Sequence, residues 1–78
     1  NPVASIYAWT GGLKHRGKLD NNAKLSEFAE KLEQVCVECI EAGEMTKDLS
    51  RLISKEQPWL TTEDFLAAID RRLQAKMA

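Results

Sequence analysis

The segment from residue 23 to residue 42 constrains the fold most, because its apolar residues recur with the spacing of one face of an α-helix. Charged side chains occupy much of the opposite side, as expected for a helix that covers a hydrophobic core. Candidate N-caps precede it at residues 20–22, and Gly43 follows it as a terminating glycine. The apolar positions of this predicted helix are Leu25, Phe28, Ala29, Leu32, Val35, Cys36, Cys39 and Ile40.

Three further helices are predicted over about residues 2–16, 46–54 and 62–77. The first begins at an Asn-Pro pair and is apolar enough to be buried on most of its circumference. Its Gly11-Gly12 pair predicts a bend, an early end or a close packing contact. Thr46 is a candidate cap for the third helix, and Thr61 or Thr62 for the fourth. The fourth helix has a predicted inward stripe of Phe65, Leu66, Ile69, Leu73 and Met77.

No segment alternates as a β-strand does, so the fold class is an all-α segment of about four helices in one unit, residues 1–78. Eleven Lys and Arg residues against twelve Asp and Glu residues give a formal net charge of -1, without a basic patch for nucleic acid. No apolar run reaches the roughly 18 residues that a membrane span requires. We therefore expect neither nucleic acid nor a membrane as a partner.

Cys36 and Cys39 form a C-x-x-C pair, which could indicate a redox centre or half of a zinc site. A redox pair normally lies at a helix N-terminus, whereas these residues lie mid-helix on the apolar face. A zinc site needs four ligands, and only His15 is a further soft candidate. Reduced structural thiols are the favoured interpretation. His15 itself lies in a basic run without a triad partner, and Trp9 and Trp59 are interpreted as anchors of a helix or a turn.

Beyond these patterns, longer stretches of the sequence match one known family. They are NPVASIYAWT at 1–10, GL at 12–13, HR at 15–16, KLDN at 18–21, Glu38, IEAG at 40–43, MTKDL at 45–49 and PWLT at 58–61. On these residues the sequence closely resembles the C-terminal part of homodimeric NADP-dependent isocitrate dehydrogenases, and the resemblance covers essentially all of the chain. Position 11 is Gly where many relatives carry Arg.

The resemblance implies that the chain is the helical C-terminal part of a large α/β subunit with an isocitrate/isopropylmalate dehydrogenase-like fold. The activity implied is oxidative decarboxylation of isocitrate to 2-oxoglutarate with NADP and Mg²⁺ or Mn²⁺. Isocitrate and the metal are bound in that family by motifs that precede this segment, so the segment alone is expected to be inactive. The implied partners are isocitrate, NADP, the remainder of the subunit and a second subunit of a homodimer.

The resemblance also implies three cofactor-binding residues at the adenine end of the NADP site. Asn1 matches the asparagine of the family's T-N-P motif, which contacts adenine. Lys47 and Asp48 match a T-K-D loop close to the adenosine portion. Taken without the resemblance, Asn1 is a helix cap, Lys47 a surface amine and Asp48 a carboxylate favoured by the helix dipole.

A second hypothesis comes from a different class of protein. Four amphipathic helices could form an independent protein-interaction module that buries its apolar stripes against a partner. The reduced cysteines favour a cytoplasmic location, or the mitochondrial matrix in a eukaryote.

Overall fold

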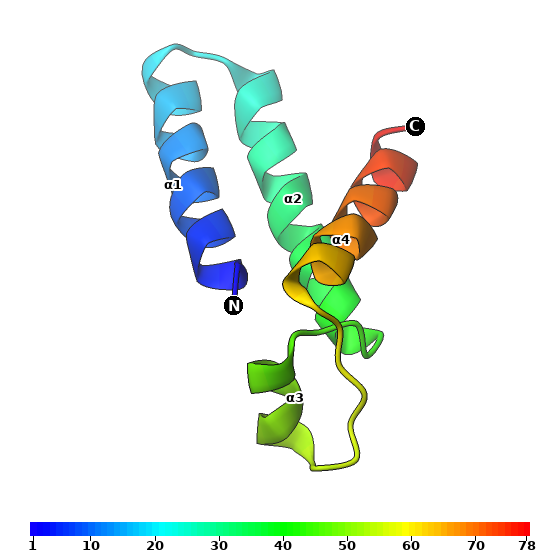
Figure 1. The fold of residues 1–78 in the computed structure, drawn as a ribbon. Coiled ribbons are helices and arrows are strands. Elements are labelled where there is room, and N and C mark those ends of the chain that lie inside the picture. The colour runs from blue at the N-terminus through cyan, green and yellow to red at the C-terminus, as the bar shows by residue number, and fades with distance from the viewer.

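A computed structural model describes all 78 residues as four helices, α1 (Val3–Leu19), α2 (Ala23–Glu41), α3 (Lys47–Ile53) and α4 (Thr62–Met77). The predicted all-α class is confirmed, and the only β-pairing is an isolated parallel bridge between Thr46 and Leu60. Figure 1 shows α1 and α2 as an antiparallel hairpin, α4 crossing the second half of α2, and α3 at the far end. None of the helices is long and apolar enough to cross a membrane.

Both ends of α2 are formed as the sequence predicts. The side chain of Asn22 accepts a hydrogen bond from the Leu25 amide at 3.2 Å, which satisfies one of the donors left free in the first turn. At the other end Gly43 has a φ of +87°, and the amide of Glu44 donates to the carbonyl of Cys39 at 2.8 Å. This is a Schellman ending, for which glycine is the preferred residue.

The prediction for the end of the first helix is wrong, because α1 continues through Gly11 and Gly12 to Leu19. A methyl group at either glycine would meet no atom within 4 Å, so neither glycine serves a close packing contact. The helical hydrogen bonds of α1 and its packing along α2 offset the cost of about 1 kcal/mol per glycine. The close approach is instead at Gly17, where a Cβ would lie 3.0 Å from the carbonyl oxygen of Asn22.

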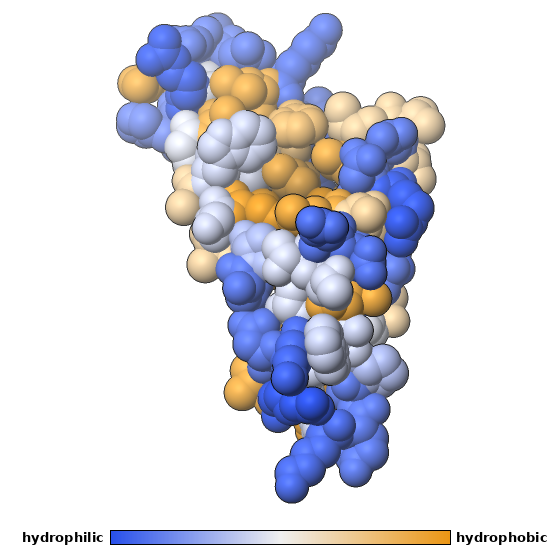
Figure 2. All heavy atoms as spheres, viewed as in Figure 1, coloured by the Kyte–Doolittle hydropathy of each residue, from blue (hydrophilic) through white to orange (hydrophobic).

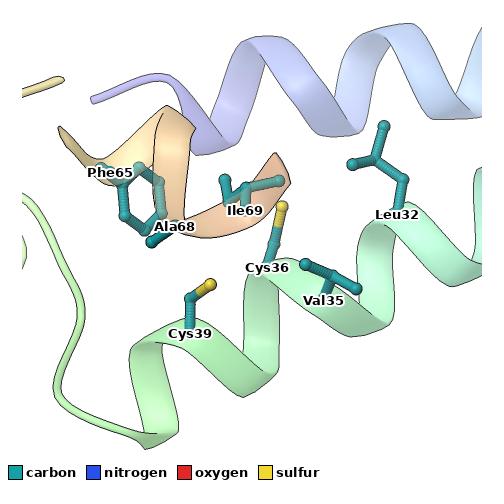
Figure 3. Packing of buried hydrophobic residues seen from close by; sticks show 7 residues of the cluster. All are labelled: Leu32, Val35, Cys36, Cys39, Phe65, Ala68 and Ile69. Carbon is teal, nitrogen blue, oxygen red and sulfur yellow. The ribbon is translucent and has the colours of Figure 1, made fainter. Parts of the chain in front are cut away.

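The hydrophobic core lies where α2 is flanked by α1 and α4. Figure 3 shows its buried side chains projecting from α2 and α4 toward one another. Val3 and Ile6 of α1 pack against this cluster and are partly buried. Each large side chain here contributes about 1.5 to 3 kcal/mol by leaving water. The core cluster consists of Leu32, Val35, Cys36, Cys39, Phe65, Ala68 and Ile69.

Two expectations about burial are wrong in this chain. The first helix was expected to be buried on most of its circumference, yet only Thr10 and Gly17 are buried and Trp9 is 55% exposed. The reason is that α2 is the only helix packed along α1. On α4, Leu66 and Met77 are exposed. Because α4 crosses α2 rather than running alongside it, only a short part of its stripe reaches the core.

Polar contacts reinforce both helix pairs. Between α1 and α2, the hydroxyl of the fully buried Thr10 donates to Glu33 at 2.5 Å, and Lys14 donates to the other carboxylate oxygen at 3.1 Å. Between α4 and α2, Lys76 donates to Glu38 at 2.8 Å, and Arg72 of α4 donates to Glu44, just after α2, also at 2.8 Å. These contacts fix how the long helices sit relative to each other, and hence where the segment after α2 begins.

The segment that contains α3 is held differently. No other helix packs against α3, and its apolar residues Leu52 and Ile53 are 83% and 60% exposed. It was predicted over residues 46–54 and spans 47–53. The side chain of Met45, just before α3, is fully buried. Figure 2 shows apolar atoms gathered where the longer helices meet and hydrophilic atoms over much of the α3 end.

Candidate functional site

The three residues predicted to bind the cofactor lie at two helix N-termini. Asn1 precedes α1, whereas Lys47 and Asp48 form the start of α3. Figure 1 shows the N-terminus of the chain directed toward the α3 end. The fold therefore brings together the beginning of the sequence and the loop that follows α2.

Asn1 acts as a cap through its side-chain oxygen, which accepts a hydrogen bond from the amide of Val3 at 2.9 Å. The first helix starts at Val3 with Pro2 already in a helical conformation, one residue later than predicted. An asparagine side chain has a second lone pair on its oxygen and two N–H donors. Capping therefore uses one lone pair of the oxygen, and the NH₂ group is the part of the side chain that can donate to the neighbouring Asp48 carboxylate.

The Asp48 carboxylate lies close to Asn1, and its surroundings lower its pKa. Thr46 Oγ1 donates a hydrogen bond to Asp48 Oδ1 at 2.5 Å. This bond is the main reason that the pKa of Asp48 lies below its ordinary value. Desolvation raises the pKa by less than the bond lowers it, and the side chain of Asn1 and the amide of Leu49 add smaller lowering effects. Asn1 and Asp48 are therefore neighbours in space.

The predicted cap of α3 is wrong in its detail. Thr46 occupies the N-cap position, but its hydroxyl makes no hydrogen bond to the backbone of the first turn. The hydroxyl donates to the Asp48 carboxylate instead, and no first-turn amide donates to its oxygen. Thr46 thus positions the Asp48 carboxylate rather than capping α3 through its side chain.

Lys47 lies next to an aromatic ring that sequence reasoning did not connect with it. Its Nζ atom is 5.4 Å from the centroid of the Trp59 ring, within the range of a cation–π contact. Trp59 had been interpreted as the anchor of a turn, and it is 44% exposed. The sequence carries no signal for this contact, because it depends on how the loop before α4 folds back.

Backbone contacts join the two segments that carry Lys47 and Trp59. The loop before α4 returns alongside the loop after α2, and the amide of Leu60 donates to the carbonyl of Met45 at 2.7 Å. Thr46 and Leu60 form the isolated parallel bridge. Lys47 follows Thr46 and Trp59 precedes Leu60, so each lies one residue from the bridge, and both are exposed.

The cysteines and His15 lie outside this site. Cys36 and Cys39 are free thiols with no exposed surface. Both lie on the apolar face of α2, as predicted. Burial is the main cause that raises the pKa of both thiols, which disfavours the reactive thiolate. His15 is exposed on α1.

The site is an open surface. Asn1, Lys47 and Asp48 line none of the hollows of the chain, and the largest hollow lies along α1 and α2 among several glutamates. No three His, Cys, Asp or Glu side chains come together as potential metal ligands. What the chain offers at this place is one amide, one carboxylate and one ammonium at the edge of two helix N-termini.

Comparison with curated proteins decides the family resemblance, although no family model matches the chain. NADP isocitrate dehydrogenase of Sphingobium yanoikuyae is 55% identical over 78 residues, which are 100% of this chain and 19% of the relative. NADP isocitrate dehydrogenase 1 of Mycobacterium tuberculosis is 54% identical over the same share of both proteins. The chain matches NADP isocitrate dehydrogenases along its whole length. The resemblance seen in the sequence is thereby confirmed.

The match extends to plants, since the NADP isocitrate dehydrogenase of Glycine max is 48% identical over 82 aligned positions, which cover 100% of the chain and 20% of the relative. The chain thus spans about a fifth of the length of these dehydrogenases. Several apolar residues of α1 and α3 are exposed in the four helices, among them Trp9, Leu52 and Ile53.

Proposed function

We propose that this chain is the C-terminal portion of an NADP-dependent isocitrate dehydrogenase and forms the adenine end of its NADP site. The full enzyme would oxidise and decarboxylate isocitrate to 2-oxoglutarate. The observation that carries the proposal is the 48–55% identity to such dehydrogenases along the whole chain. The geometry adds support, because Asn1 is distant in sequence from Lys47 and Asp48, yet its side chain lies next to the Asp48 carboxylate.

Each of the three side chains has a chemical role that suits adenosine. The amide of Asn1 can donate and accept, as a purine edge requires, and its capping bond uses one lone pair of the oxygen. Asp48 is an acceptor for an amino or hydroxyl group of the ligand, and the Thr46 hydroxyl holds its pKa below the ordinary value. Lys47 supplies three donors and a positive charge for a ring nitrogen or a phosphate. Bound NADP⁺ supplies the hydride acceptor of the reaction.

The remaining parts of the proposed active site belong to the rest of the subunit. Mg²⁺ or Mn²⁺ and isocitrate would be bound there, as the family resemblance implies. We also propose that the full enzyme is a homodimer, as the family resemblance implies. The alternative of an independent interaction module has no observation in its favour.

The full-length protein tests this function directly. Purified enzyme with isocitrate, NADP⁺ and Mn²⁺ should form NADPH, followed by absorbance at a wavelength where NADP⁺ does not absorb. The 78-residue chain alone should form none, because it lacks the other binding groups. Absence of NADPH formation by a folded full-length protein would overturn the proposal, and so would turnover by the isolated chain above a control preparation.

A further inference from the structure

The Lys47 ammonium is not paired with a carboxylate, whereas several other basic side chains of this chain are. Lys14, Arg72 and Lys76 each lie within 3.1 Å of a carboxylate. Lys47 makes no salt bridge at all, and its nearest described partner is the face of Trp59 at 5.4 Å. A π-face attracts a cation without neutralising its charge and without accepting conventional hydrogen bonds from its three N–H groups.

The adjacent carboxylate of Asp48 has other partners. One oxygen of Asp48 accepts the Thr46 hydroxyl, and the Asn1 side chain lies on the same carboxylate. Lys47 and Asp48 are neighbours in sequence and form no ion pair. The result is a lysine whose charge and hydrogen-bond donors remain available to a ligand.

Trp59 is itself fixed by the backbone. The residue after it is hydrogen-bonded to Met45 and paired with Thr46, and Met45 anchors the loop through a fully buried side chain. A lysine side chain is a flexible four-carbon stem that loses rotamer freedom when it binds. A ring held beneath its end reduces that loss, because part of the ordering is already present in the free protein.

We propose that Trp59 is a positioning residue that orients the Lys47 ammonium toward the adenosine portion of NADP. This inference rests on the proposed function, and it assigns a role to a side chain that neither the sequence patterns nor the comparisons single out. Trp59 acts through Lys47 and is not a catalytic residue. The Trp59 ring is partly exposed beside the Lys47 ammonium, and Lys47 is followed directly by Asp48, which lies next to Asn1.

The test uses the full-length enzyme and separates an aromatic effect from a structural one. Trp59→Leu removes the π-face but keeps an apolar side chain, and Trp59→Phe is the matched control that keeps a π-face. Trp59→Leu should raise the KM for NADP⁺ by about threefold, as expected for an exposed cation–π contact, and leave kcat and the KM for isocitrate near the parent values. Trp59→Phe should restore most of the loss.

A double-mutant cycle shows whether the effect passes through Lys47. In a Lys47→Met background, Trp59→Leu should have no further effect on the KM for NADP⁺. The inference is overturned if Trp59→Leu leaves this KM unchanged, if Phe fails to rescue it, or if the increase is the same without Lys47. NADPH formation by the parent enzyme under the same conditions keeps the proposed function standing in each of these cases. Loss of NADPH formation in the parent itself would instead overturn the function.

Discussion

The two ends of the molecule are built by different means. The α1–α2–α4 region is held by a cluster of buried side chains and by ion pairs between helices. The α3 region is held by one buried methionine, a backbone hydrogen bond and a single β-bridge, and no other helix packs against it. The predicted cofactor residues lie where the second region meets the start of the first.

This difference teaches that stability and ligand binding should be separable by mutation. Regions with few buried apolar contacts open most readily and are often used for binding. Substitutions in the core cluster should therefore change the free energy of unfolding, and substitutions at Asn1, Lys47 or Trp59 should change cofactor affinity. The predictions below test that separation, beginning with the largest effect.

Phe65→Ala should lower the free energy of local unfolding by about 3 to 5 kcal/mol, because Phe65 is fully buried and leaves a cavity between α2 and α4. Hydrogen exchange of peptides from these helices, measured in the full-length protein, reports this loss. Leu66→Ala is the matched control on the same helix, where the side chain is 43% exposed and a much smaller change is expected. A Phe65 effect no larger than that of Leu66 would contradict the described core.

Replacement of both Cys36 and Cys39 by Ala should cost about 1 to 3 kcal/mol through lost packing and leave turnover near the parent value. Both thiols have no exposed surface, and burial raises their pKa. Denaturant unfolding and steady-state kinetics on the same variant give the two quantities. A folded variant with a large loss of turnover would show that the thiols take part in redox or metal chemistry.

Thr10→Val should lower stability by about 1 kcal/mol near pH 7, because it removes the hydrogen bond to Glu33 while nearly keeping the volume. The pKa of Glu33 is lowered, first by Thr10 and also by Lys14. A lowered carboxyl pKa stabilises the fold above the ordinary pKa of about 4.3, and this contribution is lost as the pH falls through the folded value. The gap between parent and Thr10→Val should therefore narrow from pH 7 to pH 3, and a constant gap would contradict this origin.

The sequence predicted the long helices well and their surroundings less well. Strong periodicity and clear end signals defined α2, with Asn22 and Gly43 at its ends as expected. The glycine pair in α1 and the exposed Leu66 were mispredicted, because local propensity does not register which neighbouring helix is present or at what angle it crosses. Which apolar side chains are buried depends on the neighbouring helices, and helical periodicity alone does not identify those neighbours.

The candidate site shows the same limit. Asn1, Lys47 and Asp48 came from a family resemblance and not from spacing, since alone they resemble caps and surface charges. The roles of Thr46 and Trp59 toward them were not predicted. Both depend on the return of the loop before α4 beside Met45, which is a long-range contact without a local sequence signal.

The most direct test of the account measures the KM for NADP⁺ of an Asn1→Ser variant in the full-length enzyme. Serine keeps the ability to cap α1, so the change removes the amide and spares the helix start. If Asn1 contacts adenine, the KM for NADP⁺ should rise about tenfold, equivalent to about 1.4 kcal/mol, while the KM for isocitrate stays near the parent value. An unchanged KM for NADP⁺ in this variant would contradict a cofactor role for Asn1 and leave it a structural cap.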